Sequence, residues 1–172
     1  NLGAVHPDGQ VYCSAVGLQG HINVVDRSYF RRAVETRGFV IGDYQIGRIT
    51  GKPVVVLSYP HYDKTSQLQS VIFAAFDLTW LNQLASKVPL PKGTTLNILD
   101  GTGTILNHWP DPSRWIGKSM AGSPLSKTIL ASRGEGTAEA TGLDGVRRLY
   151  AFTPLLDSSS GKRSGTVDLA RA

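Results

Sequence analysis

The sequence predicts an α+β fold of two similar lobes in tandem, each a roughly five-stranded antiparallel sheet with flanking helices. Short apolar runs are separated by clusters rich in glycine and proline, of which the chain has 19 and 9. This pattern is typical of strands joined by tight turns. The order of the elements in the first half recurs in the second, and several residue identities recur with it. Together these observations favour one duplicated unit.

The first half contains a hairpin, a helix and three further strands. The hairpin covers residues 1–16 and turns at His6-Pro7-Asp8-Gly9. A helix is predicted over 27–37, with Asp26 as its N-cap and Gly38 directly after it. Strands are then predicted at 39–49, 53–62 and 70–78. The run Val-Val-Val-Leu at 54–57 is too apolar for a solvated edge, so this strand should lie inside the sheet.

The second half repeats this order. A hairpin is predicted from strands 94–99 and 104–108, a helix over 124–133, and strands at 137–141, 146–153 and 165–170. An amphipathic helix over 80–88, ended by Pro89-Leu90-Pro91, links the halves. We therefore expect a first lobe at 1–78, a linker at 79–92 and a second lobe at 93–172.

Five identities recur in the same order in the two halves. Gly51, Pro60 and Asp63 recur 94 positions later as Gly145, Pro154 and Asp157, Asp8-Gly9 recurs after 92 as Asp100-Gly101, and Asp77-Leu78 recurs after 91 as Asp168-Leu169. Small gaps align the whole lobe, which supports an internal duplication.

The composition and motifs exclude several classes of function. The net charge is +5, but Lys and Arg are scattered, with one cluster at Arg31, Arg32 and Arg37, so no nucleic-acid partner is predicted. Cys13 is the single cysteine, so we predict no intrachain disulfide and no metal site. Nucleophile elbows, His-Glu-x-x-His and phosphate-binding loops are absent from the sequence. We therefore predict neither catalytic residues nor a cofactor.

No apolar run approaches the ~20 residues that cross a bilayer, and the chain starts at Asn1 without a methionine. We interpret it as an excised part of a longer protein.

Five short motifs occur in order along nearly the whole chain: DRSYFRRA at 26–33, TGKP at 50–53, YP at 59–60, FDL at 76–78 and LDG at 99–101. Together they resemble the double Cache domains, also called PDC or tandem PAS-like sensors, of bacterial histidine kinases, chemoreceptors and diguanylate cyclases. The resemblance implies a periplasmic sensor domain of a membrane-anchored, homodimeric receptor, foremost a sensor histidine kinase. The helix that leads such domains out of the membrane and the output domain are absent from this sequence, so a chemoreceptor or cyclase parent stays open.

The resemblance also implies a small-molecule ligand in the membrane-distal first lobe. The candidate ligand-binding residues are Arg27, Tyr29, Phe30, Tyr44, Tyr59, His61 and Asp77. In family members that bind amino acids, an arginine followed by aromatics holds the carboxylate and an aspartate on the last strand holds the ammonium. Arg27, Tyr29, Phe30 and Asp77 match these positions by type, and a guanidinium suits a carboxylate. The Tyr29-Phe30 pair replaces the usual Trp-Tyr pair, so another small carboxylate is an alternative to an amino acid.

Each candidate has a structural alternative. Arg27 could pair with Asp26 or Asp43, Asp77 could cap the following helix, both tyrosines (Tyr44 and Tyr59) could be packing residues, and His61 could be exposed. In the second lobe we predict that two segments pack in the apolar core, His108-Trp109-Pro110 and Trp115-Ile116-Gly117. This lobe would then transmit a signal without binding a ligand. The remaining alternative to a sensor is a structural or protein-interaction module whose pocket is filled by its own side chains.

Overall fold

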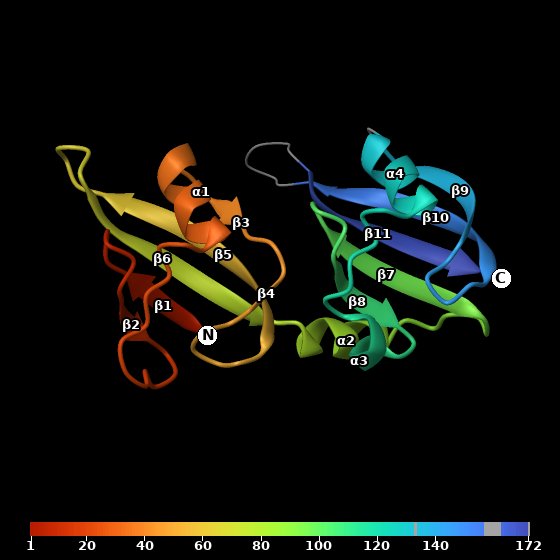
Figure 1. Cartoon of the computed structure of the whole chain (residues 1–172), viewed down its shortest axis with the longest axis horizontal. Helices are drawn as coiled ribbons and strands as arrows, with labels where there is room; N and C mark the ends of the chain where they lie inside the picture. Colours follow the sequence, from red (N-terminus) through yellow and green to blue (C-terminus); the bar gives the residue numbers. More distant parts are fainter. Residues whose placement is uncertain (133, 157–162, 172) are drawn as a thin grey trace. The chain divides into compact units, whose positions relative to one another are not determined.

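The computed structural model describes residues 1–132, 134–156 and 163–171. The chain forms two compact units, Asn1–Asp77 and Leu78–Ala172, which we call lobe one and lobe two (Figure 1). Each lobe is built on one antiparallel sheet, of six strands in lobe one and five in lobe two. The predicted α+β fold of two tandem lobes is thereby confirmed.

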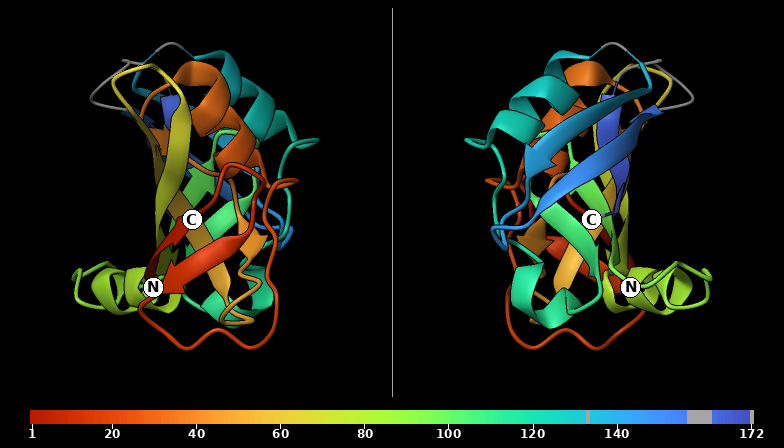
Figure 2. Two further views of the ribbon diagram at one scale, coloured as in Figure 1. Left: turned by 90° about the vertical axis from the view of Figure 1, so that its left-hand side faces the viewer. Right: turned by 90° about the vertical axis from the view of Figure 1, so that its right-hand side faces the viewer.

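Lobe one has the strand order β2-β1-β6-β5-β3, and β4 pairs separately with β5. Its elements, in chain order, are β1 (Leu2–Val5), β2 (Val11–Ser14), α1 (Ser28–Thr36), β3 (Val40–Ile41), β4 (Gln45–Ile46), β5 (Pro53–Tyr62) and β6 (Leu68–Asp77). Figure 2 (left) shows α1 on one side of this sheet only. The core therefore lies between α1 and the inner face of the sheet.

The helix α1 buries one face and ends one residue before the predicted end, and the residue that terminates it is Arg37 and not the predicted Gly38. Tyr29, Phe30 and Ala33 are its buried residues, as helical spacing requires. Arg37 adopts a left-handed conformation with φ 52° and ends the helix. The prediction of Asp26 as N-cap is wrong, because the N-cap position is Arg27 and no side chain caps the helix.

The strand predicted at 39–49 is broken into β3 and β4, and the prediction of one continuous strand is wrong. Gly42 lies at the break, and its N–H donates to Val56 O at 2.8 Å. A Cβ on Gly42 would lie 2.9 Å from Tyr29 Cβ and 3.0 Å from Val56 O. This close approach to α1 and β5 requires a residue without a side chain. The chain leaves the sheet here and returns as β4.

Lobe two has the strand order β8-β7-β11-β10-β9. Its elements are α2 (Thr79–Ala85), β7 (Thr94–Asp100), β8 (Ile105–Trp109), α3 (Pro112–Trp115), α4 (Pro124–Ala131), β9 (Gly136–Thr141), β10 (Arg147–Leu156) and β11 (Arg163–Arg171). In Figure 2 (right), α4 and α2 lie on opposite sides of this sheet. The short helix α3 was not predicted, and α2 is shorter than the helix expected at 80–88.

The helix α4 begins with strong local signals. Ser123 is its N-cap and accepts from Ser126 N at 3.1 Å, and Pro124 occupies the first turn. Both features are favoured at helix starts. The predicted end of this helix, Arg133, lies outside the described residues.

The registers of the strands show that the two sheets are copies of one arrangement. A row across lobe one contains, strand by strand, Ser14, Gly3, Phe73, Ser58 and Val40. The matching row of lobe two contains His108, Asn97, Asp168, Phe152 and Gly136. The spacing is 94 positions for three of these pairs, as in 97 − 3 and 152 − 58. This spacing equals the one predicted from Gly51 and Gly145. Both glycines lie in turns and have positive φ, 67° and 81°.

Two of the recurring identities do not correspond in the structure. Gly9 N donates to His6 O and Gly103 N donates to Asp100 O, so Gly9 corresponds to Gly103, again after 94 positions, and not to Gly101. Asp168 lies in the row of Phe73 and therefore corresponds to that residue, not to Asp77. Asp157 lies outside the described residues.

Candidate functional site

Lobe one contains a narrow, solvent-open cavity of about 30 Å³ between the inner face of the sheet, the start of α1 and the segment around β4. Its floor is apolar and comes from β5 and β6, with Val54, Val56, Phe73 and Ala75. Its polar lining comes from the loop before β5 and from the start of α1, with Arg27, Gln45, Arg48 and Thr50. An apolar floor with a few convergent polar groups is typical of a small-molecule site.

Two arginines line this cavity, and only one of them is neutralised. Arg48 donates from both terminal nitrogens to the two oxygens of Asp26, at 2.6 and 2.8 Å. Arg27 Nη2 donates to the main-chain carbonyl of Ile46 at 3.3 Å. Within residues 1–132, 134–156 and 163–171, Arg27 forms no ion pair with a carboxylate. Asp43, the other partner considered for it, contacts Arg32 at 3.5 Å.

The Asp26–Arg48 pair is stable over the physiological pH range. The hydrogen bonds from Arg48 lower the pKa of the Asp26 carboxyl, and the same hydrogen bonds raise the pKa of Arg48. Both groups are therefore charged and cancel each other. The guanidinium of Arg27 is thus the charged group of the lining that has no carboxylate partner among the described residues, and a guanidinium can donate to an anionic group.

Tyr29 forms part of the wall and is held rigidly. Its ring lies 6.5 Å from that of Phe73, and its carbonyl accepts from Ser58 Oγ at 3.0 Å, which ties α1 to β5. Burial raises the pKa of Tyr29 to about 12, so the phenol stays protonated. Its neighbour Phe30 is buried in the core and does not line the cavity.

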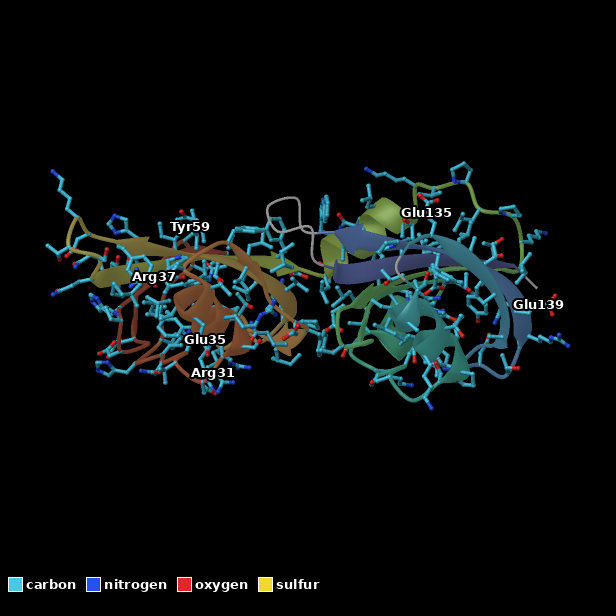
Figure 3. All side chains as sticks on the ribbon, turned by 90° about the horizontal axis from the view of Figure 1, so that it is seen from above. Arg31, Glu35, Arg37, Tyr59, Glu135 and Glu139 are labelled. Carbon is cyan, nitrogen blue, oxygen red and sulfur yellow. The ribbon has the colours of Figure 1, made fainter. Side chains whose placement is uncertain are left out.

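Tyr59 and His61 lie on the other face of the sheet. Side chains alternate along a strand, and Val54, Val56 and Ser58 of β5 face inward. Tyr59 is 55% exposed, and Figure 3 shows it on the side opposite Arg31 of α1. This alternation was visible in the sequence and separates both residues from the cavity.

Asp77 and Tyr44 lie near the cavity without lining it. Asp77 is on the inner face of β6, one inward position beyond Ala75, and accepts from Lys52 Nζ at 3.1 Å. The N-cap position of α2 is Leu78, which has no side-chain cap hydrogen bond. Tyr44 is half-buried in the segment before β4. The sequence did not predict three further lining residues, Gln45, Arg48 and Thr50. A straight strand at 39–49 would have kept this segment within the sheet, whereas the break at Gly42 lets it cover the inner face.

Lobe two has a narrow, solvent-open cavity of about 20 Å³ at the corresponding place. Arg148 and Tyr150 in its lining correspond to Val54 and Val56, since 148 − 54 and 150 − 56 both equal 94. The lining also contains Asn97, His108, Trp115 and Asp144. Trp115 belongs to the core cluster, as predicted, whereas His108 contributes a polar ring to the cavity. The prediction of a purely apolar plug at His108 is therefore wrong.

The described part of the chain holds no group of three His, Cys, Asp or Glu placed to bind a metal ion. In the same residues, no helix combines the length and apolar character that a membrane span requires.

The fold matches solved sensor domains. The extracellular domain of rpHK1S-Z16, assigned as a histidine kinase, aligns with a TM-score of 0.86 at 21% identity, over 100% of this chain and 70% of that one. The ligand-binding domain of the Pseudomonas aeruginosa PAO1 amino acid chemoreceptor PctB, in complex with L-Gln, aligns at 0.72 and 17% identity, over 99% and 66%. That of PctC from the same organism, in complex with GABA, aligns at 0.70 and 18%, over 99% and 73%. The chain has the double Cache fold.

A curated relative of this double Cache chain is Sporulation kinase D of Bacillus subtilis (strain 168). It is 34% identical over 76 residues, which are 44% of this chain and 15% of that kinase. The match thus spans a small part of the kinase. No family model matches the sequence. The solved neighbours are ligand-binding sensor domains and not catalytic domains.

Proposed function

We propose that this chain is the extracytoplasmic ligand-sensing domain of a bacterial membrane receptor of the histidine kinase type, and that lobe one binds a small molecule with a carboxylate. The observation that carries the proposal is the Arg27 guanidinium in the lining of an apolar cavity, beside an Asp26–Arg48 pair that neutralises itself. The likeness to rpHK1S-Z16 and to Sporulation kinase D supports a kinase parent.

An amino acid is the carboxylate that best suits this lobe. Its carboxylate would bind Arg27, and its ammonium would approach Asp77 on the same face of the sheet. The Lys52 side chain that contacts Asp77 is 62% exposed, and such ion pairs contribute little to stability. A ligand ammonium can therefore replace Lys52 at little cost. PctB and PctC, which share the fold, were solved with L-Gln and GABA.

The proposed signal is a closure of the helix and loop at residues 17–38 over the inner face of the sheet. A ligand shifts such an equilibrium only by binding the closed state more tightly than the open one. The change would pass through residues 80–88 to lobe two and then to the membrane of a dimeric, inner-membrane parent. Arg27 and Tyr29 sit at the start of the element that moves.

The proposal is tested by thermal unfolding with a panel of amino acids and small carboxylates. At about 100 times the Kd, a ligand stabilises by about 2.7 kcal/mol, which is a shift of several degrees in Tm. Arg27→Ala removes a charge-assisted contact and should weaken binding about 10- to 100-fold. Arg31→Ala, which removes an exposed arginine of the same helix, should leave the Kd unchanged.

Two results would contradict the proposal. A ligand whose affinity is the same in wild type and Arg27→Ala would remove the anion-binding role of that arginine. A panel in which no compound raises the Tm would favour the structural module with a self-filled pocket.

A further inference from the structure

We propose that lobe two carries a proton-binding site at Asp168, through which the domain responds to pH independently of any ligand in lobe one. The site consists of Asp168 on β11, Asn97 on β7 and His108 on β8, which lie side by side in one row of the sheet.

Asp168 is a buried carboxyl with a single hydrogen bond. Its exposure is 0%. Oδ1 accepts from Asn97 Nδ2 at 2.6 Å, and Oδ2 has no hydrogen-bond partner in the part of the chain that the structure describes. An ionised carboxylate in such a place is costly unless a cation pairs with it. The neutral acid is the form that this environment favours.

Among the residues that the structure describes, no cation is placed to pair with this carboxylate. The next inward position along β7 is Leu99, and α4 buries Leu125, Ser126 and Ile129 against the sheet while its Lys127 is exposed. On β10 the opposite residue is Phe152, and the titratable neighbours on that strand are Tyr150 and Arg148. Arg148 is bound through both terminal nitrogens to Asp144, at 2.8 and 2.7 Å. Burial raises the pKa of Asp168 to about 7, and only the Asn97 hydrogen bond opposes this rise.

Asn97 connects the buried carboxyl to the cavity of lobe two. Because its amide nitrogen donates to Asp168, its Oδ1 must accept, and His108 Nδ1 donates to it at 2.5 Å. This assigns the proton of neutral His108 to Nδ1. The imidazole lines the cavity, so the chain of three side chains leads from the interior to a space near solvent. Burial lowers the pKa of His108, which favours the neutral imidazole.

The carboxyl is not needed to build the fold. The corresponding residue of lobe one is Phe73, which packs in the core at 3% exposure. The same row of the sheet is therefore stable with an aromatic ring at this position. A buried acid in its place adds a group that binds and releases protons.

The direction of the pH effect follows from the raised pKa. Folded Asp168 has a pKa of about 7, against the model value of 3.8 for an accessible carboxyl. The folded state thus holds more protons than the unfolded state between these two values, so the stability of lobe two falls as the pH rises through this range. Above about pH 7 the loss is complete.

Asp168→Asn tests this site, because asparagine has the shape of the protonated acid and cannot ionise. The variant should unfold at nearly the same temperature as wild type at pH 3.5, and roughly 10 °C or more above it at pH 8. Glu135→Gln removes an exposed carboxylate of the same lobe, and its difference from wild type should be the same at both pH values. A difference between Asp168→Asn and wild type that does not change with pH would overturn the proposal.

A second measurement on the wild-type chain does not depend on the variant folding. In a ¹³C NMR titration, the Asp168 carboxyl should titrate with a midpoint between about 6 and 8, and the side-chain NH₂ of Asn97 should shift with the same midpoint. A midpoint near 4 would overturn the site. Neither experiment contains a ligand, so failure of this proposal and failure of ligand binding in lobe one are separate results.

Discussion

Replacing Leu125 with alanine will lower the free energy of unfolding of lobe two by about 2–5 kcal/mol. Leu125 lies on α4 and is 1% exposed, within the cluster that contains Ile105, Ile129 and Phe152. Truncation removes buried apolar atoms and leaves a void between helix and sheet, which the paired strands cannot close. Urea denaturation followed by circular dichroism measures the loss.

Leu84→Ala is the matched control for this change. Leu84 is on α2 of the same lobe but is 50% exposed, and alanine is a good helix former. Its effect should stay within about 0.5 kcal/mol. Equal losses for the two variants would mean that α4 does not cover the core of lobe two.

Gly3→Ala will destabilise lobe one by about 1–3 kcal/mol, although it adds one methyl group. The added Cβ would lie 2.5 Å from Cys13 O of the paired strand β2 and 2.5 Å from Phe73 Cζ. The ring can turn away, but the carbonyl belongs to the β1–β2 ladder and moves only if the pairing is disturbed. Thermal or urea unfolding measures the cost.

Gly17→Ala is the control for the Gly3 variant, because a Cβ there would have no atom within 4 Å. Its effect should be near zero. A Gly3→Ala protein as stable as wild type would mean that β1 and β2 are not paired as described. In the Gly3→Ala background, Phe73→Leu should recover part of the loss and no more, since the Cys13 carbonyl remains in contact.

The parts of the fold that local signals specify could be predicted from the sequence. The ten-residue strand β5 has the predicted bounds, because its apolar run is flanked by a turn with Gly51 and by polar residues. The failures depend on distant contacts. The break at Gly42 is imposed by Tyr29 and Val56, and Asp26 does not cap α1 because its two oxygens bind Arg48.

The identities that recur between the halves also fall into two groups, those that mark structurally equivalent positions and those that do not. Gly51 and Pro60 recur at the structural spacing of 94, Gly51 because its turn has positive φ and Pro60 because it occupies the equivalent position of the equivalent strand. The dipeptides at Asp8-Gly9 and Asp77-Leu78 are common combinations, and their recurrence at 92 and 91 did not report structural equivalence. Only the identities that share one constant spacing indicated which positions of the two lobes are structurally equivalent.

The candidate site was predictable only where chain neighbours form it. Arg27 and Tyr29 share the start of one helix and both line the cavity of lobe one; their role in binding stays a prediction. The period of two in β5 could also have assigned Tyr59 and His61 to the outer face. The bond between Asn97 and Asp168 joins residues 71 positions apart, and no local pattern indicates such a contact.

The row that contains Gly3 and Phe73 in lobe one and Asn97 and Asp168 in lobe two constrains how the halves could have diverged. An aspartate at 73 would lose the ring that covers Gly3 and would gain no amide donor. An asparagine at 3 would first meet the Cys13 carbonyl. Each single exchange should therefore destabilise lobe one, so the two positions of this row depend on each other and would have to change together.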